Sequence, residues 1–572
     1  MIKEPVSVAA IQFEPTQFRK EENILRLLAL TEDAAAHGAR LIVMPEMSTT
    51  GYCWMDREEV ADYVETVPGA TTERFGKIAA DHQCYLVVGL PEVDAQSGLY
   101  YNCAVLIGPE GIIGKHRKTH PYISEPKWAA NGDLGHQVFT TPLGNIALLI
   151  CMDIHFIETA RLAGLQDADV ICHISNWLAE RTPAPYWINR AYENDCYLIE
   201  SNRWGRERGV QFSGGSCIID PNGHIQSWRD TGDGIVYGQL YPGDRQRGFL
   251  SERRPELYKE LMTHTFMWNP LDFFGLYATK PLPAGKHSHI AVGQFEPQND
   301  ISANLQQIEQ LAVRAKAQGA ELLTLPELCL TGRYHSPADA IGLHHPSIAF
   351  LMDLSAHLRL YLLAGMAEEA SDGRRYNSAV LIGPDGLPGV YRKIHLTEED
   401  KCWATAGHEW KTFDIPCGRI GLLIGHDINF PEAGRILAMR GCDIIACPAA
   451  LDLPGPTDHP GTRVPHDYPI ATGASRYHWL LTRVRAGENN VYLSYANANP
   501  SGLSGIFGPD TFVWPRREAL VIEPQDLAVL EIDTSNLDSV YPTNVVRRKD
   551  LIAMRQPHYY QPLINAVVSA RD

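Results

Sequence analysis

The chain contains one distinctive segment twice. Residues 144–156 read GNIALLICMDIHF, and residues 418–430 read GRIGLLIGHDINF. The two copies share an apolar run followed by a short polar stretch, but Cys151 of the first copy is replaced by Gly425 in the second. A thiolate is a nucleophile, and glycine has no side chain to take its place. We therefore expect two related domains, of which only the first performs covalent chemistry.

The repeat extends along nearly the whole chain, and internal similarity of this kind determines the domain organisation. Further matching segments pair 8–15 with 290–297, 39–52 with 320–333, 101–111 with 376–386, and 189–202 with 484–497. Between the copies, prolines and glycines interrupt residues 274–289 and break any regular pattern. We therefore expect domains at 1–280 and 286–572. A Pro-, Gly- and His-rich insertion at 453–469 predicts a surface loop in the second copy.

Each copy alternates short apolar runs with helical patterns. In the first copy, residues 6–13, 85–92 and 145–153 have the composition of strands, whereas residues 23–38 show helical periodicity. Strands that alternate with helices predict a layered α/β domain. The strands lack polar alternation, which indicates sheets that are covered on both faces.

Composition limits the classes of partner. The formal net charge is −18 and there is no long basic run, so nucleic acids and anionic membranes are poor partners. We see neither a secretory signal nor an apolar run long enough to span a bilayer. The 12 cysteines are widely spread without a CxxC pair. This pattern favours reduced thiols in a cytoplasmic protein over a disulfide framework, and no spacing suggests a metal site.

Three chemically reactive residues follow strand-like runs in the first copy. Glu46 ends LIVMPE, Lys118 follows LIGPEGIIGKHR, and Cys151 follows IALLI. A carboxylate base, an ammonium that stabilises an oxyanion and a thiol nucleophile together form an acyl-transfer site. Each residue also has an ordinary interpretation, as a solvated carboxylate, a surface lysine or a buried thiol. The second copy nevertheless retains Glu327 and Lys393 at the equivalent positions.

These blocks resemble a known enzyme family. PEMSTTGY, HRKTH and LLICMD occur in the order of the Glu, Lys and Cys blocks of the nitrilase, or carbon–nitrogen hydrolase, superfamily. The downstream segments RAYEN, ESNRWG and FSGGSCIIDPNG strengthen the resemblance, which covers both halves of the chain. It implies α/β domains of the αββα four-layer sandwich type that associate in pairs.

The resemblance also implies roles for individual residues. Cys151 is the implied nucleophile, Glu46 the general base and Lys118 the cation that stabilises the oxyanion. Glu125 fits the second glutamate of the family, and the main-chain N–H of Met152 is an implied oxyanion donor. A neighbouring lysine favours the thiolate form of a cysteine. No metal or organic cofactor is required for this chemistry.

The second copy keeps part of this set. Asp400 stands at the position of Glu125, but Gly425 provides no thiol, and Cys417 lies on the turn before the strand, where we do not expect it to substitute. The simplest role for this copy is that of a built-in partner. One chain would then form a pseudo-dimer equivalent to the homodimer of single-copy relatives, and higher homo-oligomers are compatible with this arrangement.

Candidate contacts to the substrate follow the nucleophile in sequence. His155 stands where some amidase relatives carry an arginine that binds a substrate carboxylate. Trp177 ends a strand-like run, and Arg203 lies in the arginine-rich segment SNRWGRER. Packing explains the tryptophan equally well, and a charged surface explains the arginine.

The leading hypothesis is a cysteine-dependent amidohydrolase that cleaves a small, linear, non-peptide amide through a thioester and releases ammonia. An N-carbamoyl amide hydrolase would use the same residues. A nitrilase is less favoured, because that branch typically reads Cys-Trp-Glu where this chain reads Cys151-Met152-Asp153. A non-catalytic metabolite-binding protein is the alternative from a different functional class.

Overall fold

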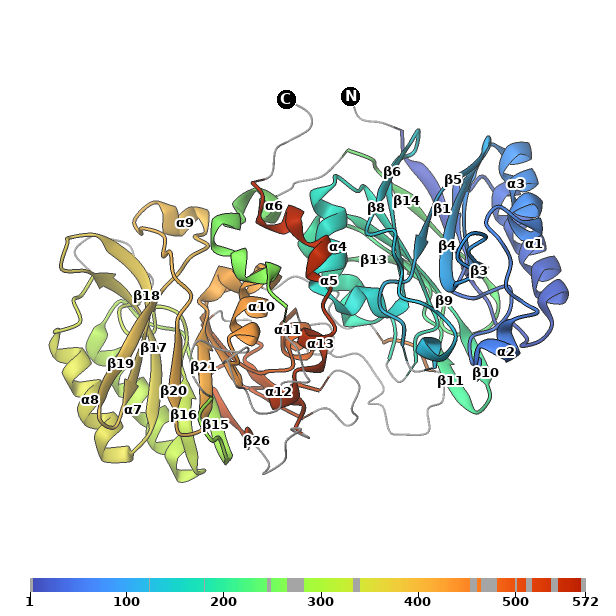
Figure 1. The fold of residues 1–572 in the computed structure, drawn as a ribbon. Helices are drawn as coiled ribbons and strands as arrows, with labels where there is room; N and C mark the ends of the chain where they lie inside the picture. The colour runs from blue at the N-terminus through green and yellow to red at the C-terminus, as the bar shows by residue number, and fades with distance from the viewer. Residues whose placement is uncertain are drawn as a thin grey trace. The chain divides into compact units, whose positions relative to one another are not determined.

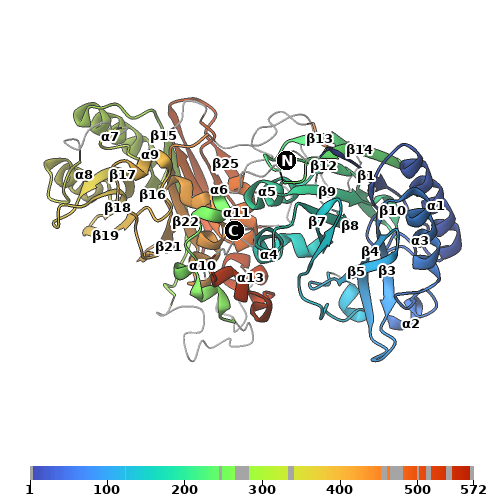
Figure 2. The same cartoon turned by 90° about the horizontal axis from the view of Figure 1, so that it is seen from above.

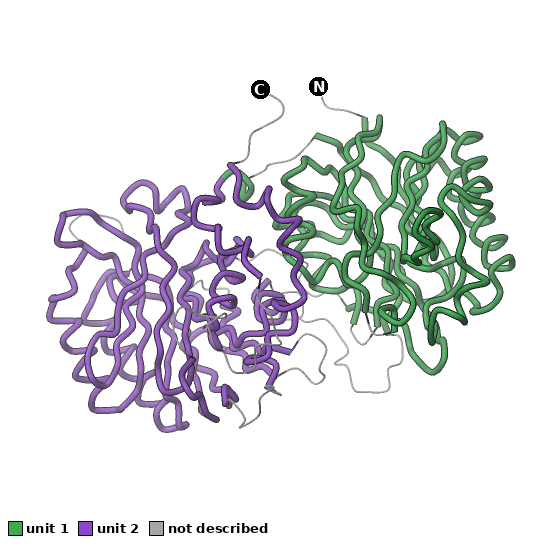
Figure 3. Tube along the Cα trace, in the orientation of Figure 1, with its two compact units in different colours: residues 1–251, 454–480, 567–572 green, residues 252–453, 481–566 purple. Residues whose placement is uncertain are grey.

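The chain folds into two compact units (Figure 3). Unit 1 comprises residues 1–251, 454–480 and 567–572, and unit 2 comprises residues 252–453 and 481–566. The computed structural model describes residues 4–122, 124–178, 181–243, 248–264, 282–332, 340–452, 460–463, 481–498, 502–510, 517–535 and 544–566. Much of the expected domain boundary and most of the expected surface loop at 453–469 lie outside these described residues.

Unit 1 contains two six-stranded mixed sheets. The first has the order β14-β1-β2-β3-β4-β5, with β1, β2 and β3 parallel. The second has the order β13-β12-β9-β8-β7-β6, with β7, β8 and β9 parallel, and a separate hairpin pairs β10 with β11. The strands are β1 Val6–Gln12, β2 Leu41–Val43, β3 Tyr85–Val93, β4 Tyr100–Gly108, β5 Gly111–Arg117, β6 Val138–Thr141, β7 Gly144–Ile150, β8 Val170–Ser175, β9 Tyr197–Asn202, β10 Trp204–Glu207, β11 Val210–Ser213, β12 Cys217–Ile219, β13 Ile225–Trp228 and β14 Gly234–Leu240.

Helices cover one face of each sheet, so unit 1 is four layers deep. Helices α1 (Lys20–Ala36) and α3 (Ala70–His82) lie side by side on the first sheet (Figures 1 and 2). Helices α4 (Ile157–Leu165) and α5 (Pro185–Asn194) pack on the second. The two sheets meet where β1 contacts β9 and β4 contacts β7. Shorter helices are α2 Arg57–Val60, η1 Glu125–Lys127, η2 Cys151–His155 and α6 Gly248–Glu252.

Unit 2 repeats this architecture with the sheet orders β19-β18-β17-β16-β15-β26 and β20-β21-β22-β23-β24-β25. Its strands are β15 His287–Gln294, β16 Ala320–Thr324, β17 Tyr361–Glu369, β18 Arg375–Gly383, β19 Gly386–Arg392, β20 Thr412–Ile415, β21 Gly418–Leu422, β22 Ile444–Ala449, β23 Tyr492–Asn497, β24 Gly505–Phe507, β25 Glu518–Leu520 and β26 Asp526–Asp533. Its helices are η3 Pro255–Leu257, η4 Lys259–Met262, α7 Ile301–Ala317, α8 Pro346–Leu358, α9 Glu398–Lys401, η6 Gly425–Asn429, α10 Pro431–Met439, α11 Leu481–Asn489, α12 Val545–Arg548, α13 Asp550–Ala553, η8 Pro557–Tyr559 and η9 Gln561–Ile564.

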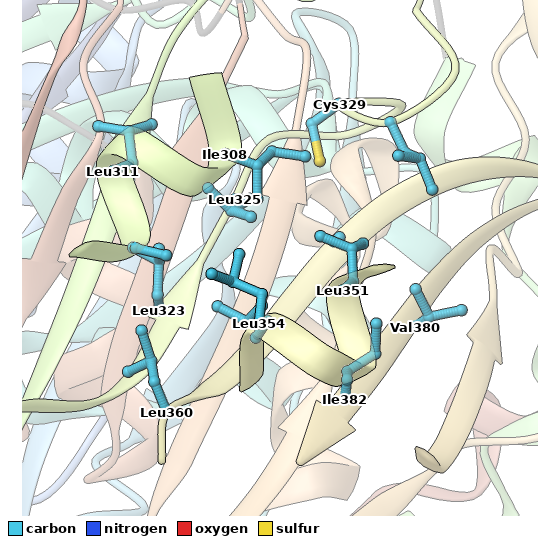
Figure 4. Close-up of a cluster of buried hydrophobic side chains, with 14 of the residues drawn as sticks. Ile308, Leu311, Leu323, Leu325, Cys329, Leu351, Leu354, Leu360, Val380 and Ile382 are labelled. Atoms are coloured by element: carbon cyan, nitrogen blue, oxygen red, sulfur yellow. The ribbon is translucent and has the colours of Figure 1, made fainter. Parts of the chain in front are cut away.

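Helix α7 shows how the sequence specifies these layers. The Asp300 side chain caps its start by accepting hydrogen bonds from the main-chain N–H groups of Ser302 and Ala303. Residues three or four positions apart then form one buried face of the helix. Figure 4 shows part of this face, which packs with α8 on the first sheet of unit 2. The labelled residues are Ile308, Leu311, Leu323, Leu325, Cys329, Leu351, Leu354, Leu360, Val380 and Ile382.

The predicted fold class is confirmed: each unit is a mixed α/β sandwich, and the two units repeat one topology. The helical pattern at 23–38 corresponds to α1. The packing of the copies as a pseudo-dimer stays a prediction. Among the described residues, no helix combines the length and the apolar character needed to cross a membrane.

A glycine in a central strand of each unit allows a close approach to the glutamate loop. A Cβ at Gly89 in β3 would lie 2.4 Å from the Pro45 carbonyl oxygen and 2.8 Å from the Glu46 Cα. In unit 2, a Cβ at Gly365 would lie 2.8 Å from the Glu327 Cα. Side chains at these positions would displace the main chain, so the sheet itself fixes where each glutamate sits.

Candidate active site

The predicted catalytic residues of unit 1 lie just beyond the ends of strands, of which some belong to the first sheet and one to the second. Glu46 follows β2, Lys118 follows β5, Glu125 begins η1, and Cys151 begins η2 directly after β7. All four side chains are buried, with Cys151 only 6% exposed. Strand ends from the two sheets thus bring together residues that are distant in sequence, and strand ends are where functional residues of layered α/β proteins tend to lie.

The Lys118 ammonium lies between two carboxylates. Its Nζ donates hydrogen bonds to Glu46 Oε1 at 2.8 Å and to Glu125 Oε2 at 2.5 Å. Asn102, on β4, bridges the same pair, because its Nδ2 donates to Glu46 Oε1 at 2.7 Å and to Glu125 Oε1 at 2.6 Å. The Tyr52 hydroxyl donates to Glu125 Oε2 at 3.0 Å. The structure therefore brings Glu46, Lys118 and Glu125 into one hydrogen-bonded cluster.

A second asparagine fixes the remaining oxygen of Glu46. Asn176, which follows β8, donates to Glu46 Oε2 from its main-chain N–H at 2.7 Å and from its Nδ2 at 3.0 Å. Its Nδ2 also donates to the main-chain oxygen of Glu46 at 2.9 Å. Neither Asn102 nor Asn176 is among the site residues predicted from the sequence. The repeat offers a signal for Asn102 alone, because YNCAV and YNSAV both keep the asparagine.

Cys151 is held in an unusual main-chain conformation at the point where β7 ends. Its φ of 45° lies in the left-handed region, which non-glycine residues seldom adopt. Asp153 braces this turn, because its carboxylate accepts hydrogen bonds from the main-chain N–H of Ile150 at 3.2 Å and from that of His120 at 3.0 Å. His116 and His120 hydrogen-bond the same carboxylate and, against the effect of burial, hold the pKa of Asp153 well below its usual range.

The electrostatics favour a neutral thiol beside a charged cluster. Burial and the Glu46 carboxylate raise the pKa of the Cys151 thiol well above its ordinary value, although Lys118 acts in the opposite direction. Burial disfavours the Lys118 ammonium, but Glu125 and Glu46 outweigh this effect and raise its pKa well above its usual value. The lysine thus favours the thiolate as expected, but two carboxylates share that lysine. A base is therefore needed to remove the thiol proton.

The candidate substrate contacts lie in two different surroundings. The His155 ring stacks on Trp177 at a centroid distance of 4.7 Å and meets the edge of Tyr186 at 4.3 Å. By contrast, Arg203 is fully buried in an ion pair with Glu207 at 2.6 Å. Met152 is buried beside the nucleophile in η2. Contacts of these residues with a substrate stay predictions.

Unit 2 reproduces the charged cluster without a thiol. Lys393 Nζ donates to Glu327 Oε1 at 2.7 Å and to Asp400 Oδ2 at 2.5 Å. Asn377 bridges the two carboxylates at 2.7 and 2.9 Å, as Asn102 does in unit 1. Gly425 begins η6 after β21 with a φ of 43°. It therefore occupies the same structural position as Cys151, and Asp400 occupies that of Glu125.

The carboxylate of Glu327 fills the space that a side chain at Gly425 would need. A Cβ built at Gly425 would lie 2.3 Å from Glu327 Oε2. The matching registers of β8 and β22 place Ala450 where unit 1 has Asn176, so unit 2 has no side-chain amide at this position to hold that oxygen. The site in unit 2 therefore differs from that of unit 1 by more than a missing sulfur atom.

We expect Gly425→Cys to create no second working site. In a Cys151→Ala/Gly425→Cys variant, ammonia release should stay at background. The new Cβ collides with Glu327, and a non-glycine residue at this φ costs on the order of 1–3 kcal/mol. Gly425→Ala, compared by thermal unfolding, controls for the strain without a thiol. Turnover by the double variant at a rate near that of the wild type would show that only the sulfur is missing.

Comparisons with known proteins agree with the repeat. A sequence model described as carbon–nitrogen hydrolase matches residues 7–247 and again residues 289–530. A protein of Pyrococcus abyssi named nitrilase is 38% identical over 262 residues, which cover 44% of this chain and 99% of the relative. The human omega-amidase NIT2 is 30% identical over 291 residues, which cover 47% of this chain and 98% of the relative.

Among solved structures, an amidase from Nesterenkonia sp. aligns with a TM-score of 0.39 and 24% identity, over 45% of this chain and 95% of that chain. The family match is the stronger result, because it covers most of the chain in two consecutive copies. The chain thus belongs to the carbon–nitrogen hydrolase family as a tandem duplication and is a hydrolase of carbon–nitrogen bonds other than peptide bonds.

Proposed function

We propose that unit 1 hydrolyses a small linear amide through a thioester on Cys151 and releases ammonia. The observation that carries the proposal is the buried cluster in which Lys118 bridges Glu46 and Glu125, next to the strand end that bears the thiol. The human relative is named an omega-amidase, which supports an amide as the substrate.

In the first half of the reaction, the neutral Cys151 thiol transfers its proton to Glu46 as Sγ attacks the amide carbonyl carbon. The negative charge that develops on the carbonyl oxygen is stabilised by Lys118 Nζ and by the main-chain N–H of Met152. The carbon–nitrogen bond then breaks, and Glu46 delivers its proton to the departing amine. Ammonia leaves, and the acyl group stays on Cys151 as a thioester.

In the second half, a water molecule attacks the thioester carbonyl carbon while Glu46 accepts a proton from it. The carbon–sulfur bond then breaks, the acid is released, and Glu46 returns the proton to Cys151 Sγ, which restores the thiol. Glu125 has a different role, because it remains a partner of Lys118 while Glu46 carries the proton. Since it also accepts hydrogen bonds from Tyr52 and from the main-chain N–H of Tyr122 at 2.8 Å, it keeps the ammonium in one place throughout the cycle.

We further propose that unit 2 is a non-catalytic copy that acts as the internal partner of unit 1, with the charged cluster kept for its structural value. Breaking a buried ion pair by removing one partner typically costs about 3–5 kcal/mol, because the other charge is left uncompensated. This cost explains why unit 2 keeps Lys393 and Glu327 although it has a glycine at the position of the nucleophile.

A cytoplasmic location of the protein stays a prediction.

The direct test is ammonia release from a panel of linear amides, N-carbamoyl compounds and nitriles. We expect amides to be the best substrates and Cys151→Ala to abolish release without a loss of thermal stability, because only the reacting atom is removed. Cys417→Ala, which removes a buried thiol of unit 2, should keep wild-type activity. Preference for N-carbamoyl compounds would change the substrate class, whereas substantial release by Cys151→Ala would refute the mechanism.

The reactivity of the thiol should depend on pH in a defined direction. Burial and Glu46 raise the pKa of Cys151. The rate of its alkylation by iodoacetamide should therefore keep increasing with pH beyond the pH range in which an ordinary thiol ionises. Glu46→Gln removes one negative charge and should move this profile to lower pH by about one unit or more, while amide hydrolysis falls by on the order of 10²-fold or more. Cys151→Ala measures the background from the other cysteines. An unchanged profile would mean that Glu46 does not act on the thiol.

A further inference from the structure

A chain of buried polar side chains lies behind Cys151, on the central strands of the second sheet. His173 and Ser175 belong to β8, and Glu200 lies directly opposite His173 on β9. All three residues are fully buried. His173 Nε2 lies 3.1 Å from the main-chain oxygen of Cys151, while its Nδ1 hydrogen-bonds Glu200 Oε2. Ser175 Oγ donates to the other oxygen of Glu200.

The main-chain oxygen of Cys151 determines which atoms donate and which accept in this series of hydrogen bonds. A carbonyl oxygen can only accept, so His173 Nε2 must carry a proton and donate it to Cys151. The bond to Glu200 at Nδ1 fixes the plane of the imidazole. Whether the proton between Nδ1 and Oε2 resides on His173 or on Glu200, the pair has no net charge, and its burial is therefore tolerable.

The carbonyl that His173 holds is half of a catalytically important group. The Cys151 C=O and the Met152 N–H belong to one peptide unit, and the planar trans peptide forces them to point in opposite directions. A donor that fixes the carbonyl therefore also fixes the direction of the N–H. It polarises the peptide as well, because hydrogen bonds in series strengthen one another.

The comparison of the two units links this chain to the presence of the nucleophile. Unit 2 keeps the Asp brace of the turn, because Asp427 accepts a hydrogen bond from the main-chain N–H of Ile424 at 3.0 Å. In the registers of β22 and β23, however, Cys447, Tyr495 and Ala449 occupy the positions of His173, Glu200 and Ser175. Glycine at 425 tolerates a positive φ without further support. The His–Glu chain is thus present only in the unit that has a reactive residue at the turn.

We propose that His173, oriented by Glu200, is a positioning residue that aims and polarises the Met152 N–H toward the oxyanion of the reacting amide. This inference rests on the proposed function, in which that N–H is one of the two oxyanion donors. It assigns to His173 no proton transfer with the substrate and no contact with it. The expected consequence of losing His173 is a slower acylation step with little change in substrate binding.

Two reactions of Cys151 Sγ distinguish a role of His173 in oxyanion stabilisation from a role in activating the thiol or in folding. Acylation of Cys151 by p-nitrophenyl acetate passes through an oxyanion, whereas its alkylation by iodoacetamide is a direct displacement at carbon and forms none. His173→Leu should lower the acylation rate by on the order of 10²-fold, comparable to the loss of an oxyanion donor. It should leave the alkylation rate and its pH profile unchanged. His173→Gln, whose amide can donate at the position of Nε2, should recover most of the rate.

The controls address folding and the proposed function separately. Cys447→Ala alters the equivalent buried position of unit 2 and should keep wild-type acylation, and thermal unfolding of each variant reports on the fold. Parallel losses of acylation and alkylation in His173→Leu, or acylation equal to that of the wild type, would overturn the inference while Cys151 chemistry stands. A wild-type protein that neither releases ammonia from linear amides nor becomes acylated on Cys151 by p-nitrophenyl acetate would overturn the proposed function and the inference with it.

Discussion

The buried ammonium of Lys118 between Glu46 and Glu125 is the interaction on which the rest of the site depends. It joins the ends of β2 and β5 to the η1 segment, and Asn102 adds two hydrogen bonds to the same carboxylates. A lone charge could not be buried in this way, because its desolvation would cost more than the fold can supply. Two carboxylates around one lysine also disfavour a resting thiolate. The site is therefore poised for proton transfer rather than holding a preformed anion.

The two units show which parts of this arrangement belong to the fold and which to the chemistry. Both keep the lysine, the two carboxylates, the bridging asparagine and the aspartate that braces the turn. Unit 2 lacks the thiol, the amide of Asn176 and the His173–Glu200 chain, and the Glu327 carboxylate lies in the space of a side chain at Gly425. In unit 1 the retained set joins the segments that follow β2 and β5 and braces the turn after β7. We propose that the Asn176 amide and the His173–Glu200 chain of unit 1 orient the groups that react.

The sequence predicts the α/β layers and the placement of Glu46, Lys118 and Cys151 beyond strand ends, because apolar periodicity and the internal repeat report directly on strands. The pairing of His173 with Glu200 could not be predicted, since it is set by the register of β8 and β9. The contact of Asn176 with Glu46 could not be predicted either, since it joins the ends of strands that belong to different sheets. The ion pair of Arg203 with Glu207, four residues further along the chain, was not predicted either. The direction in which the pKa of Cys151 shifts could not be predicted either, because it depends on how closely one lysine and two carboxylates surround the buried thiol.

The most direct measurement is acid-quenched mass spectrometry of the enzyme during turnover of its best amide substrate, followed by peptide mapping. Covalent catalysis by unit 1 alone predicts one acyl group per chain, located on the peptide that contains Cys151, with none on peptides of unit 2. Steady-state ammonia release without an acyl group on Cys151, or with an acyl group on a residue of unit 2, would contradict the assignment of Cys151 as the sole nucleophile.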